Sequence, residues 1–474
     1  MTQPQSTHAP HLHRRIGLPS AVALNMLEMI GVGPFITLPL IIAAAGYRLS
    51  IWAWLLGAVI AVADGLVWAE LGAAFPRAGG SYAFLQEIYG PKGAGKWLSF
   101  LYVWQVSFTA PLSIASGCIG LSSFLAWFWP GLERSPLAAL PMVHWSNFAA
   151  ATACLLVTWL LYRRLSVVTG LAWVLFAGVL AAIAGVIVSG FSHAAAAGGW
   201  QMPASPAGSV AVAIGGLAQA TLIATYDYWG YYNICFLGGE VREPRRTIPA
   251  AILLSVLFVA TFYLLMNMAA LPSMREAASH VTESAAVRVQ LVADIAQSAF
   301  GRAAGRLMAA LIVWTAFASV FSLLLGYSRV PYAAARDGNY FRFLAAIHPN
   351  HGIPHRSLVA LGLVASLFCF FSLAQVITML VVTRILLQFL LQQAGVVWLR
   401  MKRPELDRPF EMPLYPMPPI VATAGFLFML ANRANALQGL LVAVGIGLSG
   451  SLIYCVRARV RGEWPFAAKD ADLP

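Results

Sequence analysis

Long apolar runs alternate with short polar segments along almost the whole chain. A helix of about 20 apolar residues crosses a hydrocarbon core about 30 Å thick, and windows of that length recur from end to end. We also expect a short interfacial helix at 78–92 and an amphipathic helix on the outer side at 281–299. The pattern predicts membrane spans at 19–46, 51–75, 97–128, 144–162, 167–191, 209–238, 247–271, 303–335, 357–374, 376–400, 414–432 and 436–456, the ninth and tenth divided at SLAQ (372–375).

Composition agrees with this pattern. The chain has 474 residues, of which 60% are hydrophobic and only 10% are charged, whereas a soluble domain has about 25% charged residues. We therefore expect an integral membrane protein with one domain, 19–456, between a disordered tail at 1–18 and a second tail at 457–474, and no cleavable signal peptide. The five cysteines lie in apolar runs without a CxxC pair, so we expect neither disulfides nor a metal site.

The distribution of charge predicts the orientation in the membrane. Although the net charge is +12, the basic residues gather in alternate loops rather than on one surface, which argues against nucleic-acid binding. The segment 272–306 mixes both signs. Alternate loops rich in Lys and Arg are typical of cytoplasmic loops, so both termini are expected in the cytoplasm. The basic clusters lie at 14–15, 77–96, 163–164, 242–246, 329–356, 400–408 and 457–461.

Two predicted spans contain residues that interrupt a helix at mid-depth. The first span has GVGP (31–34), and the sixth has TYDYWGYYN (225–233), each with a carboxylate nearby. Unwound backbone is tolerated inside a membrane only where it lines a cavity or is buried in protein, and interruptions at corresponding places of two halves indicate a transporter's binding site. The alternative is that each glycine serves close helix packing.

Several motifs carry a family resemblance. GVGPFITLP, AELGAAFPRAGGSYAFLQEIYG (69–90), YDYWGYYNICFLGGEVREPRRTIPAAI (226–252), SRVPYAAARDGNYFRFLAAIHPNHGIP (328–354) and WLRMKRPELDRPFEMPLYP (398–416) resemble conserved stretches of the amino acid–polyamine–organocation transporters. LYRRLSVVTGLAWVLFAG (161–178) is similar to the polyamine branch and its bacterial relatives. The resemblance implies a leucine-transporter fold, with inverted repeats at 19–191 and 209–400, spans one and six broken, and peripheral helices at 414–456.

The same resemblance implies secondary transport of an amino acid, an organic amine or a polyamine across the cell membrane by alternating access, with protons as the coupling ion. Residues 165–192 lack the lysine that replaces a sodium ion in some members. Exchange without net proton coupling remains open, and so does an amine sensor that does not transport. A transporter of the major facilitator fold would have a different, characteristic loop after its second span. This chain has FPRAGGSY there, which argues against that fold. We find no catalytic grouping or cofactor motif and expect no enzyme.

The resemblance also implies the substrate contacts. Amides of Gly31, Val32 and Gly33 would hold a carboxylate, because a half-helix that begins at Pro34 directs N–H donors and a positive dipole end towards it. Carbonyls near Tyr226 and Trp229, beside Gly230, would accept from an amine. Tyr226 takes the position of the family's occluding aromatic residue.

Buried charges within the spans are the candidates for proton coupling or for binding a cationic group. Glu28 and Asp227 lie about a turn from the two interruptions, and Asp64 lies in the second span. Intramembrane carboxylates usually mark substrate or proton sites, although each could be a neutral, hydrogen-bonded structural group. Arg384 could pair with Glu28 or with Asp64.

The remaining candidates have weaker patterns. Glu70 and Glu240 lie near cytoplasmic helix ends and are predicted to form gate or loop salt bridges with Arg77 or with the basic residues at 242–246. Four residues on the third and eighth spans, which flank the site in this fold, could contact the substrate, although packing is an alternative for each: Trp104, Gln105, Trp314 and Phe317.

Overall fold

The computed structural model describes residues 12, 14–136, 143–196, 210–272, 285–371, 381–432 and 436–466. Over these residues the chain forms helices and two isolated bridges but no strand, which confirms the all-helical prediction. The SLAQ boundary lies outside the described residues. The helices are α1 (Leu18–Met29), α2 (Gly33–Ala74), α3 (Ser81–Tyr89), α4 (Ala94–Phe128), α5 (Trp145–Leu161), α6 (Leu165–Ala196), α7 (Val210–Asp227), α8 (Asn233–Phe236), α9 (Pro244–Ala270), α11 (Ala285–Phe300), α12 (Arg302–Tyr327), α13 (Arg329–Arg336), α14 (His355–Phe368), α16 (Leu391–Lys402), α17 (Met417–Ala431) and α18 (Ala436–Arg461).

Length and composition make seven helical stretches of the described chain able to cross a membrane. Apolar side chains cover their outer surfaces. On α18, for example, Leu437, Leu441, Leu448, Leu452 and Val456 are all exposed. The prediction of a multi-pass membrane protein is therefore confirmed. The seven stretches are Gly33–Ala74, Ala94–Phe128, Leu165–Ala196, Pro244–Ala270, Arg302–Arg336, Val381–Lys402 and Leu437–Arg461.

The helix α2 changes direction at Gly46. The backbone there has φ 73° and ψ 172°, which is not helical. The predicted first span ends at this residue and the second begins shortly after it. A glycine is needed because this part of backbone space is open almost only to a residue without a Cβ.

Replacing Gly46 with alanine is expected to lower the free energy of unfolding by about 1–3 kcal/mol, the usual cost of a residue held in such a conformation. The matched control is Gly170→Ala in α6, where a Cβ would meet no atom within 4 Å. Thermal unfolding of the two purified variants in detergent gives the comparison. Equal melting temperatures would contradict the proposed role of Gly46.

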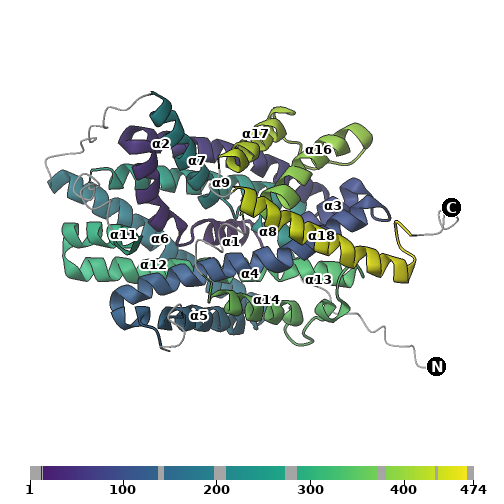
Figure 1. The fold of residues 1–474 in the computed structure, drawn as a ribbon, viewed down its shortest axis with the longest axis horizontal. Helices are drawn as coiled ribbons and strands as arrows, with labels where there is room; N and C mark the ends of the chain where they lie inside the picture. The colour runs from purple at the N-terminus through teal and green to yellow at the C-terminus, as the bar shows by residue number, and fades with distance from the viewer. Residues whose placement is uncertain are drawn as a thin grey trace.

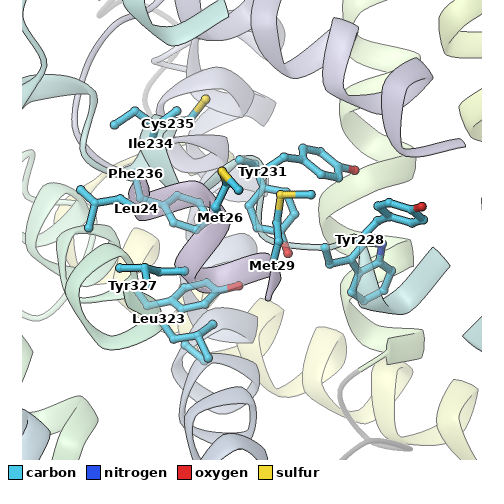
Figure 2. Packing of buried hydrophobic residues seen from close by; sticks show 14 of the residues in the cluster. Leu24, Met26, Met29, Tyr228, Tyr231, Ile234, Cys235, Phe236, Leu323 and Tyr327 are labelled. Carbon is cyan, nitrogen blue, oxygen red and sulfur yellow. The ribbon is translucent and has the colours of Figure 1, made fainter. Parts of the chain in front are cut away.

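The centre of the molecule is formed by α1 and α8 (Figure 1). The short helix α1 packs against α6, α8, α9 and α12, and almost all of its residues are buried. Figure 2 shows Leu24, Met26 and Met29 of α1 among the buried side chains of α8 and its preceding turn, with Leu323 and Tyr327 nearby. The core therefore surrounds the two segments in which the sequence predicts interruptions.

Some residues of both expected tails make defined contacts in the structure. Ile16 is completely buried, and its N–H and that of Arg15 donate to the Glu240 carbonyl oxygen at 3.0 and 2.8 Å. At the other end, α18 continues to Arg461. Beyond it, burial alone would raise the pKa of the Glu463 carboxyl, but Lys96 and Arg457 hold it below its usual range. The burial of Ile16 thus orders part of the tail at 1–18, for which disorder was predicted, and ion pairs of Glu463 fix part of the tail at 457–474.

Candidate functional site

The first interruption is a non-helical segment at 30–32. The helix α1 ends at Met29, Ile30 has φ −91° and ψ 69°, and α2 begins at Gly33. Pro34 occupies the first turn of α2, where its missing N–H costs nothing because the first four amides of a helix have no partner within the helix. The segment therefore ends one helix and starts another at the glycines and the proline of GVGP.

The second interruption is a non-helical segment at 228–232, between the end of α7 at Asp227 and the start of α8 at Asn233. Gly230 has φ +128°, and a Cβ on it would lie 2.8 Å from the Met29 nitrogen. The Tyr263 hydroxyl donates to the carbonyl oxygens of Met29 and Asp227 at 2.8 and 3.2 Å. A glycine without a side chain and a tyrosine from α9 thus hold the two segments against each other.

A cavity of about 150 Å³ lies between the two non-helical segments. An engineered cavity of that size is large enough to bind benzene, so this one suits a molecule as small as alanine or serine. It is lined by Glu28, Met29, Gly31, Val32, Gly33, Ile36, Thr37, Ser113, Ser116, Gly117, Tyr226, Asp227, Trp229, Tyr232, Ser319, Leu323 and Arg384.

Most of the predicted contact residues meet at this cavity, but several do not line it. Pro34 and Gly230 are buried beside it. The Trp104 ring nitrogen donates to the Ser449 hydroxyl of α18 at 3.2 Å, and Gln105 donates to Thr109 at 2.6 Å. The remaining two belong to α12: Trp314, which donates to the Leu175 carbonyl oxygen of α6 at 3.0 Å, and Phe317, which packs against the core.

Two carboxylates line the cavity and are nearly completely buried. Asp227 is 4% exposed and accepts a hydrogen bond from the Thr37 hydroxyl of α2. Glu28 is 7% exposed, and its Oε2 atom has no hydrogen-bond partner among the described residues. The cavity therefore has acceptors for a cationic group or for protons.

Arg384, in the helical stretch just before the π-helix Ile385–Leu390, brings a positive charge to the same cavity. It donates to the Ser113 hydroxyl at 2.7 Å and to the Tyr232 hydroxyl at 3.2 Å. No carboxylate of the described chain lies within 4.0 Å of its guanidinium nitrogens, so neither the Glu28–Arg384 nor the Asp64–Arg384 ion pair is formed.

Asp64 is completely buried away from the cavity lining. It accepts hydrogen bonds from the Tyr231 hydroxyl at 2.5 Å and from the Gln393 side-chain amide. The Tyr231 hydroxyl and the Gln393 amide therefore satisfy this carboxyl group without an arginine.

The predicted cytoplasmic salt bridges have other partners than their sequence neighbours. Glu70 binds Arg400 at 2.6 Å and lies 3.5 Å from Arg408. Glu240 forms its ion pair with Arg329 at 2.8 Å, and Arg77 forms one with Glu87 at 2.9 Å. The prediction of Arg77 or residues 242–246 as partners of Glu70 and Glu240 is therefore wrong, because helix packing brings residues far apart in the chain into contact.

Sequence reasoning missed the hydroxyl-bearing side of the cavity. Ser113, Ser116 and Gly117 come from α4, and Ser319 comes from α12. The Ser319 hydroxyl donates to the Glu28 carbonyl oxygen at 3.3 Å. The cluster of small residues at 113–117 inside an apolar span was the available signal.

The fold and the cavity define a multi-pass membrane protein with a small, partly polar cavity between the segments 30–32 and 228–232. The sequence profile of the family described as "Amino acid permease" matches residues 16–455. The chain therefore belongs to this family of the amino acid–polyamine–organocation superfamily, which confirms the resemblance seen in its motifs.

Relatives in the family are similar over most of their length. The serine/threonine exchanger SteT of Bacillus subtilis is 25% identical over 94% of this chain and 96% of its own. The b(0,+)-type amino acid transporter 1 of Homo sapiens is 24% identical over 98% of this chain and 91% of its own length. The Asc-type amino acid transporter 1 of Mus musculus is 25% identical over 88% of this chain and 76% of its own length. These relatives are transporters and not enzymes, in agreement with the sequence analysis.

Proposed function

We propose that this permease is a secondary transporter that moves a small amino acid across the cell membrane by alternating access. The observation that carries the proposal is the cavity between the segments 30–32 and 228–232, which holds two carboxylates and one arginine. Such a cavity offers partners for both ends of a zwitterion. The family and its named relatives, which are amino acid exchangers and transporters, support an amino acid as the substrate.

The proposal includes the leucine-transporter architecture, with repeats at 19–191 and 209–400, two peripheral helices at 414–456, and both termini in the cytoplasm. The segments 30–32 and 228–232 are then the breaks of the first and sixth of twelve spans. Support comes from their contact at the molecular centre and from the alternation of basic loops. Glu70, Glu240 and Arg77, each in a salt bridge, then lie on the cytoplasmic side near the gate.

Coupling to protons would use a carboxylate that exchanges a proton for the cationic group of the substrate. Glu28 and Asp227 are the candidates in the cavity, and Asp64 is a third candidate that is buried outside the cavity lining. The alternative is exchange of internal for external amino acid without net proton movement, which the serine/threonine exchanger among the relatives favours.

A binding screen tests the proposed substrate class. A ligand that binds only the folded state stabilises it by RT ln(1 + [L]/Kd), about 2.7 kcal/mol at a concentration of 100 Kd. We expect small amino acids to raise the melting temperature of the purified protein in detergent. If no amino acid or amine in a broad panel raises it, the proposed function is wrong.

Asp227→Asn separates the two roles proposed for this carboxylate. The substitution keeps the shape and removes the charge. If Asp227 binds the substrate's ammonium group, the variant is expected to weaken binding by about 1.5–3 kcal/mol, the range of a hydrogen bond to a charged group. If Asp227 carries the coupled proton, binding persists, accumulation driven by a pH gradient falls, and exchange survives.

Binding by calorimetry and uptake into liposomes together distinguish these cases. The control is Asp407→Asn, which removes an exposed carboxylate paired with Arg245 and should change neither measurement. Unchanged affinity together with unchanged accumulation in Asp227→Asn would make Asp227 a structural group and leave Glu28 as the candidate.

A further inference from the structure

A second cavity, of about 430 Å³, lies at the surface where α9 begins. No residue lines both this cavity and the one between the segments 30–32 and 228–232. Three arginines and one glutamate give its lining a net charge of +2, from three positive charges and one negative. The lining residues come from three separate parts of the chain: Arg14, Pro76, Glu243, Pro244, Arg245 and Arg246.

Backbone contacts hold these three parts of the chain together. The Arg242 N–H donates to the Ile16 carbonyl oxygen at 2.8 Å, which joins the segment 14–16 to the chain just before α9. A Cβ on Gly238 would lie 2.7 Å from the Arg77 carbonyl oxygen, so the chain next to Pro76 lies against the same connection. The fixed backbone therefore brings arginines from distant parts of the sequence to one cavity.

Two of the three arginines have no counter-ion. Arg245 forms an ion pair with Asp407 at 2.9 Å. Over the described part of the chain, Arg14 and Arg246 have no acidic partner within 4.0 Å, and Glu243 has no basic one. All four charged lining residues are exposed to solvent. The surplus of positive charge favours an anion, and planar guanidinium groups match phosphate oxygens with paired hydrogen bonds.

The ends of two membrane-spanning helices meet at this cavity. The helix α2 ends at Ala74, two residues before Pro76, and α9 begins at Pro244. Both helices are long and apolar enough to cross a membrane, and they pack against each other. The cavity therefore lies at the level where the hydrocarbon core gives way to lipid phosphates and water. Further along α9, the side chains of Leu257 and Phe258 are 60% and 45% exposed and offer an apolar surface to acyl chains.

From these observations we infer that this cavity binds the headgroup of an anionic phospholipid. Phosphate oxygens lie on Arg14 and Arg246, and the acyl chains follow α9. A headgroup with two negative charges, as in diphosphatidylglycerol, matches the net charge of +2. Basic pockets between membrane-spanning helices suit such headgroups. The bound lipid would tie the segment 14–16 to α9 in addition to the backbone hydrogen bonds, whatever the permease transports.

The test compares lipids that differ in the charge of the headgroup. Binding to the purified full chain in detergent is measured by native mass spectrometry and by thermal shift. The ligands are diphosphatidylglycerol, phosphatidylglycerol and phosphatidylcholine, with soluble glycerol phosphate as a competitor that has no acyl chains. We expect diphosphatidylglycerol to bind about fivefold more tightly than phosphatidylglycerol, because one more phosphate meets one more arginine. Phosphatidylcholine should bind most weakly, and glycerol phosphate should not displace the lipid.

Variants locate the binding in the cavity. Arg14→Gln combined with Arg246→Gln is expected to weaken binding of diphosphatidylglycerol about thirtyfold, about fivefold for each arginine. The matched control combines Arg342→Gln with Arg356→Gln, two exposed arginines of another basic loop, and should leave the affinity nearly unchanged. Glu243→Gln should strengthen binding, because it removes a negative charge beside the phosphates. If the first double variant does not fold, an affinity unchanged by Glu243→Gln overturns the inference instead.

Three further results would overturn it. Equal weakening by the two double variants would reduce the effect to the general attraction of a basic surface for anions. Binding of diphosphatidylglycerol no tighter than that of phosphatidylglycerol or phosphatidylcholine would leave the charge of the cavity without a role in lipid binding. Displacement of the lipid by an equal concentration of glycerol phosphate would assign the cavity to a soluble phosphate compound.

Discussion

Gly33→Leu is expected to abolish amino acid uptake while expression stays near normal. Gly33 lines the cavity, and even a Cβ there would lie 2.6 Å from Asp227 Oδ1 and 3.5 Å from its Cγ. A leucine side chain would push Asp227 away from Thr37 and fill much of a cavity of about 150 Å³. Uptake into cells or liposomes measures the effect.

The matched control for this variant is Gly445→Leu in α18, where a Cβ would meet no atom within 4 Å. This exposed glycine should accept leucine without loss of uptake. Gly33→Ala adds a smaller group and should give an intermediate loss. Near-normal transport by Gly33→Leu would show that Gly33, at the start of α2, is not part of the substrate site.

Glu240→Gln is expected to lower the free energy of unfolding by about 3–5 kcal/mol. Glu240 and Arg329 are each 2% exposed and lie 2.8 Å apart. Removing one partner of a buried ion pair leaves the other charge buried and uncompensated. Arg329 also donates to the Leu325 carbonyl oxygen and to the Ser328 hydroxyl, so it cannot turn to water easily.

The comparison for Glu240→Gln is Glu87→Gln, which breaks the exposed pair with Arg77. Pairs of that kind contribute about 0–1 kcal/mol. Thermal or denaturant unfolding of the two purified variants separates the cases. A loss below 1 kcal/mol in both variants would show that the Glu240–Arg329 pair does not hold the helix ends together.

Local sequence signals located the ends of α1 and α7 but not the partners of the charged groups. GVGP and the glycine at 230 lie where α1 and α7 end and the following helices begin. Glycine and proline act through their own backbone, so their effect can be read from a short stretch of sequence. From the sequence alone, the bend at Gly46 could not be told apart from an ordinary loop between the predicted spans 19–46 and 51–75.

Long-range contacts depend on how the helices pack, which no local pattern contains. Arg400 binds Glu70 across 330 positions of the chain, and Gln393 donates to Asp64 across 329. The same reason hid Ser113 and Ser319, two small polar residues of apolar helices that line the cavity. The places where α1 and α7 end were therefore predictable, whereas the identity of each buried charge's partner required the structure.

Counterflow in liposomes tests most directly whether the cavity carries an amino acid across the membrane. Vesicles with purified permease are loaded with an unlabelled amino acid that binds in the thermal-shift screen, and entry of the labelled form is followed. We predict transient accumulation of label with the wild type, none in empty vesicles, and none with Gly33→Leu. Absence of accumulation with the wild type, for every amino acid and amine that binds, would contradict transport by this chain.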